Sequence, residues 1–595
     1  MQRYCRVAID SPVLALDRPF DYAIPERLLG RLTVGSVVRV VLHGRNMRAF
    51  VTELVDDPAV TDPRPVRSVV AQDPVFAPDE LALGRWAADR YVAALGHVLH
   101  DAVPGRFSAP VAQERNEAPV PPATRPRWLG AELSEVIARN ASACVFPPTV
   151  RDEPDVAAHI AGEAAAAGGR TLIVCPRVDV ATDVAARIPG AVVLHGDERP
   201  RERARAWAAA RDGEAQVVVG GRSALFVPMP GLRAICVLSV HDRSLKAERA
   251  PRLHGVVVAR RRAVQSGAAF VASSPAPPLE FAAGDGVEWI TGERSDIRTE
   301  IARPRGGPVT PRLVEALRWA IGTNHDALVF VGRRGNTLRL RCQDCGWTPT
   351  CARCGSGLSE GGDAGRLVCR VCGEPAPAPV TCATCGGALV ARGWGHERVA
   401  RALEGSGLGV PVVRIVRGEV PVERPRPAVL VGTLAAAHAA VDVACVCVAD
   451  LDQQLLRPDF RAAEQALQTL HELAGALRPG GRFLVQTREP EHHAVQAFAR
   501  RSYRYFFDRE IGFRRQTGYP PFGAVVRVDM TGDAVDDLRA TVKGNGGDVV
   551  GVVDRAGRSS ALVRAPSLDP LLGPLREFAG AHARTRIDVD PVEVI

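Results

Sequence analysis

The chain has 595 residues, of which 46% are hydrophobic, and carries a net charge of +8 from 75 basic and 67 acidic residues. This length suits three to five domains, and the hydrophobic content excludes a disordered chain. No run of about 18 uncharged apolar residues occurs, and the start of the chain has no apolar signal-peptide core, so we expect a cytoplasmic protein without a membrane span. The basic excess permits nucleic-acid binding without proving it.

Residues 1–107 are predicted to form a small β-rich domain that ends in a helix. Residues 34–55 alternate apolar and polar side chains around a turn at His43–Asn46, the pattern of a β-hairpin. A helical pattern follows over residues 78–96. Residues 108–127 are rich in Pro, Ala and charge, so we expect a linker there.

Two α/β regions follow the linker. Over residues 128–305, apolar runs of strand length such as TLIVCP and AICVLSV alternate with Ala-rich helical segments, which predicts a parallel sheet. A second region of this kind begins at 306–340, is interrupted by a Cys-rich segment at 341–388 and continues over 389–490. Residues 491–595 are predicted to form a C-terminal domain.

The Cys-rich segment carries the strongest local signal. Eight of the 14 cysteines form four CxxC pairs, and two such pairs supply the four thiolates of a closed tetrahedral zinc site. We therefore expect two structural zinc ions. The expected pairing is nested, although a sequential pairing also fits the spacing. In the nested pairing one ion has Cys351, Cys354, Cys369 and Cys372, and the other has Cys342, Cys345, Cys382 and Cys385.

An arginine- and aromatic-rich stretch opens the C-terminal domain. Six arginines from Arg500 to Arg515 interleave with Tyr503, Tyr505, Phe506, Phe507 and Phe513. This composition suits contact with single-stranded nucleic acid. A solvated amphipathic helix with a buried aromatic face explains it equally well.

Several motifs occur in an order that resembles the PriA family, primosomal helicases that restart collapsed replication forks. They are RPFDYAIPE near the start, RSALF in the first α/β region, the CxxC cluster and DFRAAE in the second, then GYPPFG and the terminal DVDPVE. The resemblance implies a multidomain α/β protein. Two RecA-like helicase lobes, the second interrupted by a double zinc module with four cysteines for each ion, would lie between a β-rich N-terminal DNA-binding domain and an α/β C-terminal domain. The family's winged-helix domain has only the linker in its place.

The resemblance also implies a pocket for the 3′ end of a DNA strand in the N-terminal domain. Its residues would be Phe20, Asp21, Tyr22, Gly44 and Arg67. Asp can accept a hydrogen bond from a sugar hydroxyl, an aromatic ring can stack on a base, and Arg can bind phosphate. As an alternative, Phe20 and Tyr22 are core aromatics and Asp21 is a turn residue.

The elements that a helicase of this family uses for ATP are missing. In the stretch that aligns with the phosphate loop, Glu153 stands at the Lys position and Pro154 at the Thr position, and the chain has no GK[ST] sequence. The acidic DEEH aligns with Leu238–His241, and the GRAGR motif aligns with Gly475–Pro479 and loses both arginines. We expect no ATP hydrolysis and no catalytic residues.

The leading hypothesis is therefore a non-catalytic protein, associated with the nucleoid, that binds stalled or abandoned replication forks. It would recruit primosome proteins and the single-stranded-DNA-binding protein, partners that the resemblance implies. One alternative is an active 3′–5′ helicase with altered motifs. Another is a zinc-dependent protein-interaction scaffold without a role on DNA.

Overall fold

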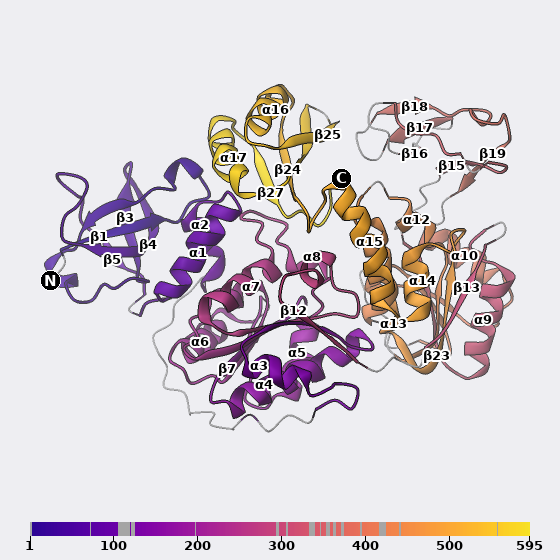
Figure 1. The fold of residues 1–595 in the computed structure, drawn as a ribbon, viewed down its shortest axis with the longest axis horizontal. Coiled ribbons are helices and arrows are strands. Elements are labelled where there is room, and N and C mark those ends of the chain that lie inside the picture. Colours follow the sequence, from indigo (N-terminus) through magenta and orange to yellow (C-terminus); the bar gives the residue numbers. More distant parts are fainter. Residues whose placement is uncertain are drawn as a thin grey trace.

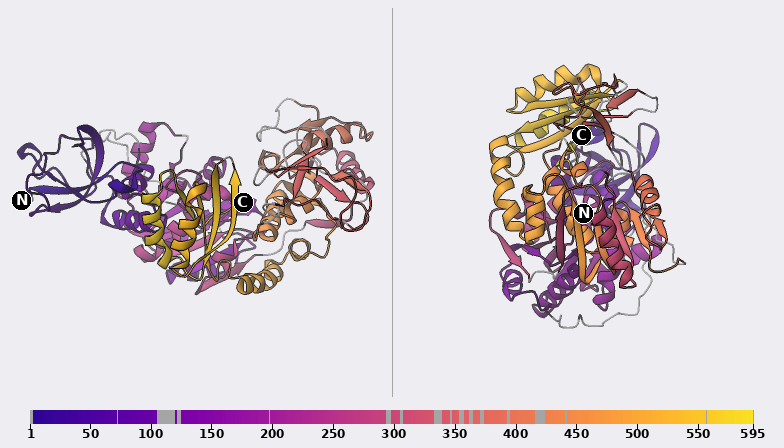
Figure 2. Two further views of the ribbon diagram at one scale, coloured as in Figure 1. Left: turned by 90° about the horizontal axis from the view of Figure 1, so that it is seen from above. Right: turned by 90° about the vertical axis from the view of Figure 1, so that its right-hand side faces the viewer.

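The computed structural model describes residues 3–71, 73–104, 120, 125–196, 198–292, 297–304, 307–332, 339–345, 347–352, 357–360, 365–369, 374–392, 395–415, 424–439, 442–457, 459–555 and 557–594. The molecule is elongated, with the N-terminal domain at one end and the Cys-rich module toward the other (Figures 1 and 2). Two α/β lobes and the C-terminal domain lie between them. Most of the predicted linker, residues 108–127, lies outside the described residues.

The N-terminal domain is an antiparallel sheet with the strand order β2-β1-β4-β3-β5. The hairpin between β3 and β4 turns at His43 and Gly44, whose φ angles of 48° and 76° are those that a two-residue turn requires. The elements are β1 (Tyr4–Ile9), β2 (Phe20–Ala23), β3 (Val37–Leu42), β4 (Arg45–Val55), β5 (Ser68–Val69), α1 (Pro78–Arg90) and α2 (Leu95–Ala102).

Lobe 1 is a sheet of seven parallel strands in the order β12-β6-β11-β10-β7-β9-β8. Helices cover both faces (Figure 1), so the central strands are buried on both sides and their sequences are continuous apolar runs. The strands are β6 (Ser142–Phe146), β7 (Arg170–Val174), β8 (Val192–Leu194), β9 (Val217–Gly220), β10 (Leu232–Val237), β11 (Ala269–Ser273) and β12 (Val287–Thr291). The helices are α3 (Glu132–Ala138), η3 (Val150–Asp152), α4 (Glu153–Ala166), α5 (Val178–Arg187), α6 (Pro200–Arg211), α7 (Gly255–Ser266) and α8 (Leu279–Ala282).

Lobe 2 is a second parallel sheet, with the order β13-β23-β22-β14-β21-β20. Its strand β13 (Arg298–Ala302) pairs with β23, so the segment that the sequence analysis assigns to the end of lobe 1 belongs to this sheet. The other strands are β14 (Ala327–Phe330), β20 (Val412–Arg414), β21 (Val429–Gly432), β22 (Val443–Val448) and β23 (Leu477–Gln486). The helices are α9 (Pro311–Gly322), α10 (His396–Glu404), α11 (Leu434–Ala439), α12 (Asp452–Leu455) and α13 (Ala462–Ala474).

The Cys-rich module is inserted between β14 and α10 of lobe 2 and consists of short antiparallel strands. They are β15 (Arg339–Cys342), β16 (Leu358–Glu360), β17 (Arg366–Cys369), β18 (Pro375–Pro377) and β19 (Leu389–Arg392). Strand β15 pairs with β19, which brings the two ends of the module together.

The C-terminal part begins with α14 (His493–Arg500) and α15 (Tyr503–Thr517), which lie against the lobes, and continues into an antiparallel sheet of order β25-β26-β24-β27. Its elements are β24 (Ala524–Thr531), α16 (Val535–Lys543), β25 (Asp548–Arg555), β26 (Arg558–Ala565), α17 (Asp569–Ala581) and β27 (Arg586–Val589). Arg576 on α17 contacts Asp17 of the N-terminal domain at 2.6 Å, and Arg90 on α1 bonds Asp590 at 2.8 Å. These contacts dock the C-terminal domain onto the N-terminal one. Among the described residues, no helix combines the length and apolar character that a bilayer crossing requires.

Candidate functional site

The loop after β6 stands where a helicase has its phosphate loop, and here its backbone donors are used locally. Strand β6 runs into Pro147 and Pro148, which have no N–H group. The Thr149 N–H donates to Asp152 at 2.8 Å, and the Thr149 hydroxyl accepts from the Arg151 N–H at 3.2 Å. The loop is therefore a closed turn rather than a cradle of free N–H groups.

Glu153, at the position of the phosphate-binding lysine, begins α4 with only 1% of its surface exposed. Its carboxylate accepts hydrogen bonds from the Ser239 N–H at 3.0 Å, from the Ser273 hydroxyl at 3.1 Å and from the Ser239 hydroxyl. Burial raises the pKa of Glu153 to about 7, against the opposing effects of His241 and of the Ser239 hydrogen bonds. The residue that the sequence analysis aligns with the phosphate-binding lysine is thus a buried acid bonded within lobe 1.

A second buried carboxylate, Glu472 on α13, joins the two lobes. Its Oε1 lies 2.5 Å from Nε2 of His241 in lobe 1, and its Oε2 lies 2.9 Å from Nε2 of His438 in lobe 2. Burial acts to raise the pKa of Glu472, but the two histidines outweigh it and hold the pKa below the usual range. Burial acts to lower the pKa of His241, yet the bond to Glu472 raises it overall. The contact is therefore an ion pair across the cleft.

Two arginines of lobe 1, Arg151 and Arg177, add further contacts with lobe 2 beside the ion pair between His241 and Glu472. Arg151 donates to the carbonyls of Ala476 and Leu477, each at 3.4 Å, in the stretch that aligns with the family's GRAGR motif. Arg177 donates to Asp242 at 3.3 Å and lies 3.4 Å from Nε2 of His438. The segments that the sequence analysis aligns with the ATP motifs therefore contact one another directly.

The sequence analysis missed Glu472, His438 and Arg151 as cleft residues. One signal could have indicated an acidic partner for His241: this histidine persists while the acidic residues before it in the motif are lost. Its Nδ1 also lies 2.7 Å from the Ser274 hydroxyl, so both ring nitrogens have partners.

In the N-terminal domain, three of the predicted pocket residues lie along the β3–β4 hairpin. The Tyr22 hydroxyl donates to the Val41 carbonyl at 3.1 Å, Gly44 forms the turn, and Arg67 donates to the Asn46 side chain at 2.6 Å. Tyr22 is buried in the core of the domain and Phe20 packs against that core on the same face of β2. The pocket assignment remains a prediction, and the core role that the alternative gave to these two aromatics is present in the structure.

Asp21 lies between them in sequence, and its side chain points to the opposite face of the sheet. Its carboxylate accepts from Arg6 Nε at 3.1 Å and from the Ala59 N–H at 2.5 Å, and the side chain is 3% exposed. The structure thus does not bring Asp21 together with Phe20 and Tyr22 on one face. A carboxylate has about four lone-pair sites, so Asp21 keeps capacity for a further donor.

In its described residues, the Cys-rich module contains one four-cysteine cluster that could hold a metal ion. The sulfurs of Cys342, Cys345, Cys382 and Cys385 all lie within 4.8 Å of one another. The Sγ atoms of Cys342 and Cys385 are 3.4 Å apart, and those of Cys345 and Cys382 are 3.5 Å apart. This is the outer set of the nested pairing. Four thiolates with no other ligand type suit zinc in a closed tetrahedral site.

The inner set is only partly described. Cys351 and Cys369 are both buried in a small core with Leu358 and Leu367. Cys354 and Cys372 lie outside the described residues. The second metal site therefore stays a prediction.

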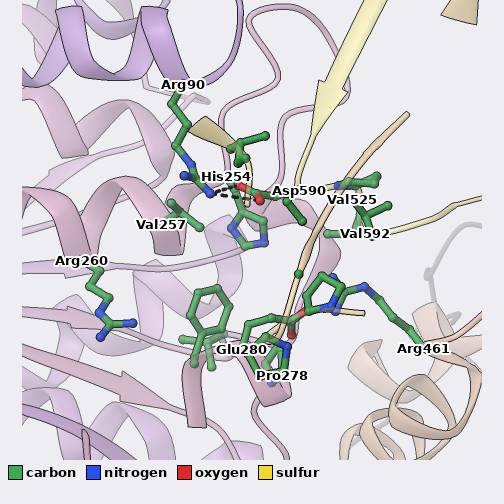
Figure 3. A pocket seen from close by; sticks show the side chains of 18 of the residues that line it. Arg90, His254, Val257, Arg260, Pro278, Glu280, Arg461, Val525, Asp590 and Val592 are labelled. Carbon is green, nitrogen blue, oxygen red and sulfur yellow. Dashed lines mark hydrogen bonds and ion pairs between the residues drawn. The ribbon is translucent and has the colours of Figure 1, made fainter. Parts of the chain in front are cut away.

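A cavity of about 610 Å³ lies where lobe 1, lobe 2, α1 and the C-terminal domain meet (Figure 3). Arg90, Arg260 and Arg461 line it together with acidic groups, and the Arg90–Asp590 ion pair lies at its edge (Figure 3). Lys246, buried beside it, pairs with Asp588 at 3.0 Å. Charged side chains paired between domains therefore hold this junction together.

Two parallel α/β lobes that meet across a polar cleft, with a β-rich domain before them, define a protein of helicase-like fold with an N-terminal DNA-binding domain. Residues 6–104 match the family model described as the 3′DNA-binding domain (3′BD) of PriA. The replication restart protein PriA of Treponema pallidum is 26% identical over 100% of both chains, and the probable replication restart protein PriA of Mycobacterium tuberculosis is 29% identical over 88% of this chain and 86% of its own. The match to Bacillus subtilis PriA, 27% identical, spans 64% of this chain and 52% of the relative. The chain is therefore similar to PriA replication restart proteins along its whole length, and its N-terminal domain matches their 3′DNA-binding domain.

We expect Cys382→Ser to remove about one metal ion per chain, because the cluster loses one of four thiolates. The measurement is the metal content of the purified protein by mass spectrometry. Cys236→Ser, in the buried strand β10 and away from the cluster, is the matched control and should keep the full content. Equal metal content in both variants would show that the cluster binds no metal.

The Glu153→Gln variant tests the buried carboxylate through pH. The folded pKa of about 7 lies above the usual value of 4.5, so the folded state holds the proton more tightly and wild-type stability falls as pH rises from 4.5 to 7. The variant has no such charge, so its stability relative to wild type should rise over this window, by about 3 kcal/mol at most. Denaturant unfolding at a series of pH values measures this difference. A difference that is constant with pH would show that folding does not shift the pKa of Glu153.

Proposed function

We propose that this protein recognises and binds stalled or abandoned replication forks and recruits the replication machinery without hydrolysing ATP. One observation carries the proposal: Glu153 replaces the phosphate-binding lysine and is buried and hydrogen-bonded between Ser239 and Ser273. A triphosphate in this position would meet a carboxylate rather than a cation.

The contact between the lobes supports the loss of hydrolysis. An ATP-driven helicase uses nucleotide and magnesium between its lobes to couple their motion to the reaction. Here the ion pair between His241 and Glu472 occupies the cleft, and Arg151 binds the carbonyls of the opposite lobe. Opening the cleft for a nucleotide would leave a buried carboxylate without its partners, which is energetically costly.

The fold of the N-terminal domain supports binding at a 3′ end. Residues 6–104 match a 3′DNA-binding domain, and Tyr22, Gly44 and Arg67 lie along one hairpin. In our proposal Phe20 and Tyr22 support the pocket from the core of the domain, Arg67 contacts phosphate, and Asp21 accepts the terminal hydroxyl.

Zinc is the metal we propose for the cysteine module, with a second ion on the Cys351, Cys354, Cys369 and Cys372 set. Closed sites of four thiolates leave no position for a reacting water, so their role is structural. The module has a small apolar core, and each ion would contribute on the order of 10 kcal/mol to its folding.

The partners we propose are branched DNA, primosome proteins and the single-stranded-DNA-binding protein. The relatives' printed name, replication restart protein, supports a role in the restart of replication. Such a protein would act in the cytoplasm, at the nucleoid.

The test of this proposal measures fork binding and ATP turnover in the same preparation. We expect fluorescence anisotropy to show salt-sensitive binding to a forked DNA, and we expect ATP turnover with that fork to equal the background of protein-free buffer. Fork-stimulated turnover that disappears in Glu153→Gln or His241→Ala would contradict the non-catalytic function. Negligible binding to every fork would instead favour a protein-interaction scaffold.

Asp21→Ala tests the 3′-end pocket. We expect the variant to lose the preference for a fork with a free 3′ hydroxyl over one with a blocked 3′ end, with little change in general, salt-dependent affinity. Competition binding with the two forks measures the preference. Glu53→Ala is the matched control, because Glu53 also pairs with Arg6 and removing it changes the charge equally. Retained preference in Asp21→Ala would remove Asp21 from the pocket.

A further inference from the structure

Helix α15 has two sides of different chemistry. Tyr503, Phe506, Glu510 and Arg514 are buried, whereas Arg504, Asp508, Arg509, Phe513 and Arg515 are exposed. The interleaved arginines and aromatics of this stretch therefore separate into an inner and an outer face. The expectation of a buried face accounts for the inner residues; of the outer ones, Arg504 also packs over Trp289 of lobe 1, its guanidinium carbon 5.3 Å from the ring centre.

The inner face fixes α15 across both lobes. The Tyr503 hydroxyl donates to the Pro277 carbonyl of lobe 1 at 2.8 Å. The Phe507 ring meets the Trp289 ring of lobe 1 edge to face, with 4.9 Å between the ring centres. On the side that faces lobe 2, the Arg514 guanidinium forms an ion pair with the Glu464 carboxylate, with 3.6 Å between nitrogen and oxygen. The helix is thus a rigid rod at the joint of the lobes, and it leads into the C-terminal domain (Figure 1).

The outer face carries arginines stacked on aromatic rings. Tyr505 and Arg509 are four residues apart and therefore neighbours on the helix, and the Arg509 guanidinium carbon lies 3.5 Å from the centre of the Tyr505 ring. The Arg500 guanidinium carbon lies 4.7 Å from the same centre. Stacking holds the guanidinium planes in place, so less conformational entropy is lost when they bind phosphate or stack on a base.

An exposed ring continues this row. Phe513 is four residues beyond Arg509 and 48% exposed. Gly512 beside it has open space above its backbone. Near the end of the helix, the Arg515 guanidinium carbon lies 4.7 Å from the centre of the Phe522 ring, which is 38% exposed. A large ring left in solvent among cations is a platform for a planar ligand.

The charge of this face selects the partner. Arg500, Arg504, Arg509 and Arg515 are exposed, and on the exposed side of α15, whose residues the structure describes throughout, Asp508 is the single acid, paired with Arg504 at 2.9 Å. Cations spaced along a rod with flat groups between them match the phosphates and unstacked bases of a single strand. Paired bases in a duplex would not expose their faces to the rings.

We propose that the outer face of α15, which we define as Arg504, Tyr505, Arg509, Phe513 and Arg515 together with the adjacent Arg500 at the end of α14, binds single-stranded DNA at the joint of the lobes. The inference rests on the proposed function, binding to branched DNA, and adds a second contact separate from the N-terminal domain. The arginines bind phosphates, and Phe513 with the Arg509–Tyr505 stack contacts bases.

The experiment measures the affinity of the full-length protein for a labelled thymidine oligonucleotide by anisotropy, across a salt series. Arg504→Gln/Arg509→Gln should weaken binding about tenfold at low salt and reduce the slope of log affinity against log salt by about 1.4, the value for two lost phosphate contacts on a single strand. The matched control, Arg201→Gln/Arg205→Gln, removes two exposed arginines from α6 on lobe 1, far from α15 (Figure 1), and should change little.

Two single variants separate binding from stability, since both positions are exposed. Phe513→Ala should weaken single-strand binding about fivefold or more, because one base loses its stacking partner, and should leave affinity for blunt duplex unchanged. Asp508→Asn should strengthen binding several-fold, because it removes the single acid of this face. A merely structural role for Asp508 predicts no gain.

The outcomes distinguish this inference from the proposed function. Equal losses in the α15 variant and the α6 control, or unchanged single-strand affinity in all α15 variants while forks still bind, would overturn the inference and leave the proposed function intact. A loss in Phe513→Ala that is as large on duplex as on single strand would overturn the single-strand assignment. Wild-type protein that binds neither forks nor single strands would overturn both.

Discussion

The arrangement of this protein depends on one buried carboxylate, Glu472, which two histidines hold at the junction of the lobes. His241 comes from lobe 1 and His438 from lobe 2, so the ion pair joins two sheets that are otherwise separate. The lobe contacts of Arg151 and Arg177 surround it. Because a buried charge is tolerated only with its partners in place, this geometry favours one relative position of the lobes. Helix α15, which touches both lobes, takes its position from the same constraint.

Glu153 is a buried acid whose hydrogen bonds are all made within lobe 1. In a nucleotide-binding protein the start of this helix offers N–H groups and a cation to phosphate. Here the carboxylate and three hydrogen bonds from serines fill the space with the protein's own groups. The polar groups of this site are thus satisfied by the protein itself.

The sequence predicts the parallel lobes well, because strands buried on both faces are apolar runs that stand out between Ala-rich helices. It also predicts the cysteine cluster, since CxxC spacing fixes the ligands locally.

Prediction from the sequence fails where residues far apart in the chain pair with one another. Strand β13 joins lobe 2 through β23, about 180 residues later in the chain, and nothing in its own sequence indicates this. The sequence also does not show which faces the FDY residues take: alternation along β2 points Asp21 to one face and Phe20 and Tyr22 to the other, and the pocket they are assigned to stays a prediction. The partners of His241 could not be identified because Glu472 follows it by 231 positions.

The bond from Arg90 to Asp590 joins residues 500 positions apart. During synthesis the N-terminal domain leaves the ribosome long before Asp590 does, so Arg90 has no ion-pair partner while both lobes are being made. Docking of the C-terminal domain onto α1 is therefore a late event in the folding of this molecule.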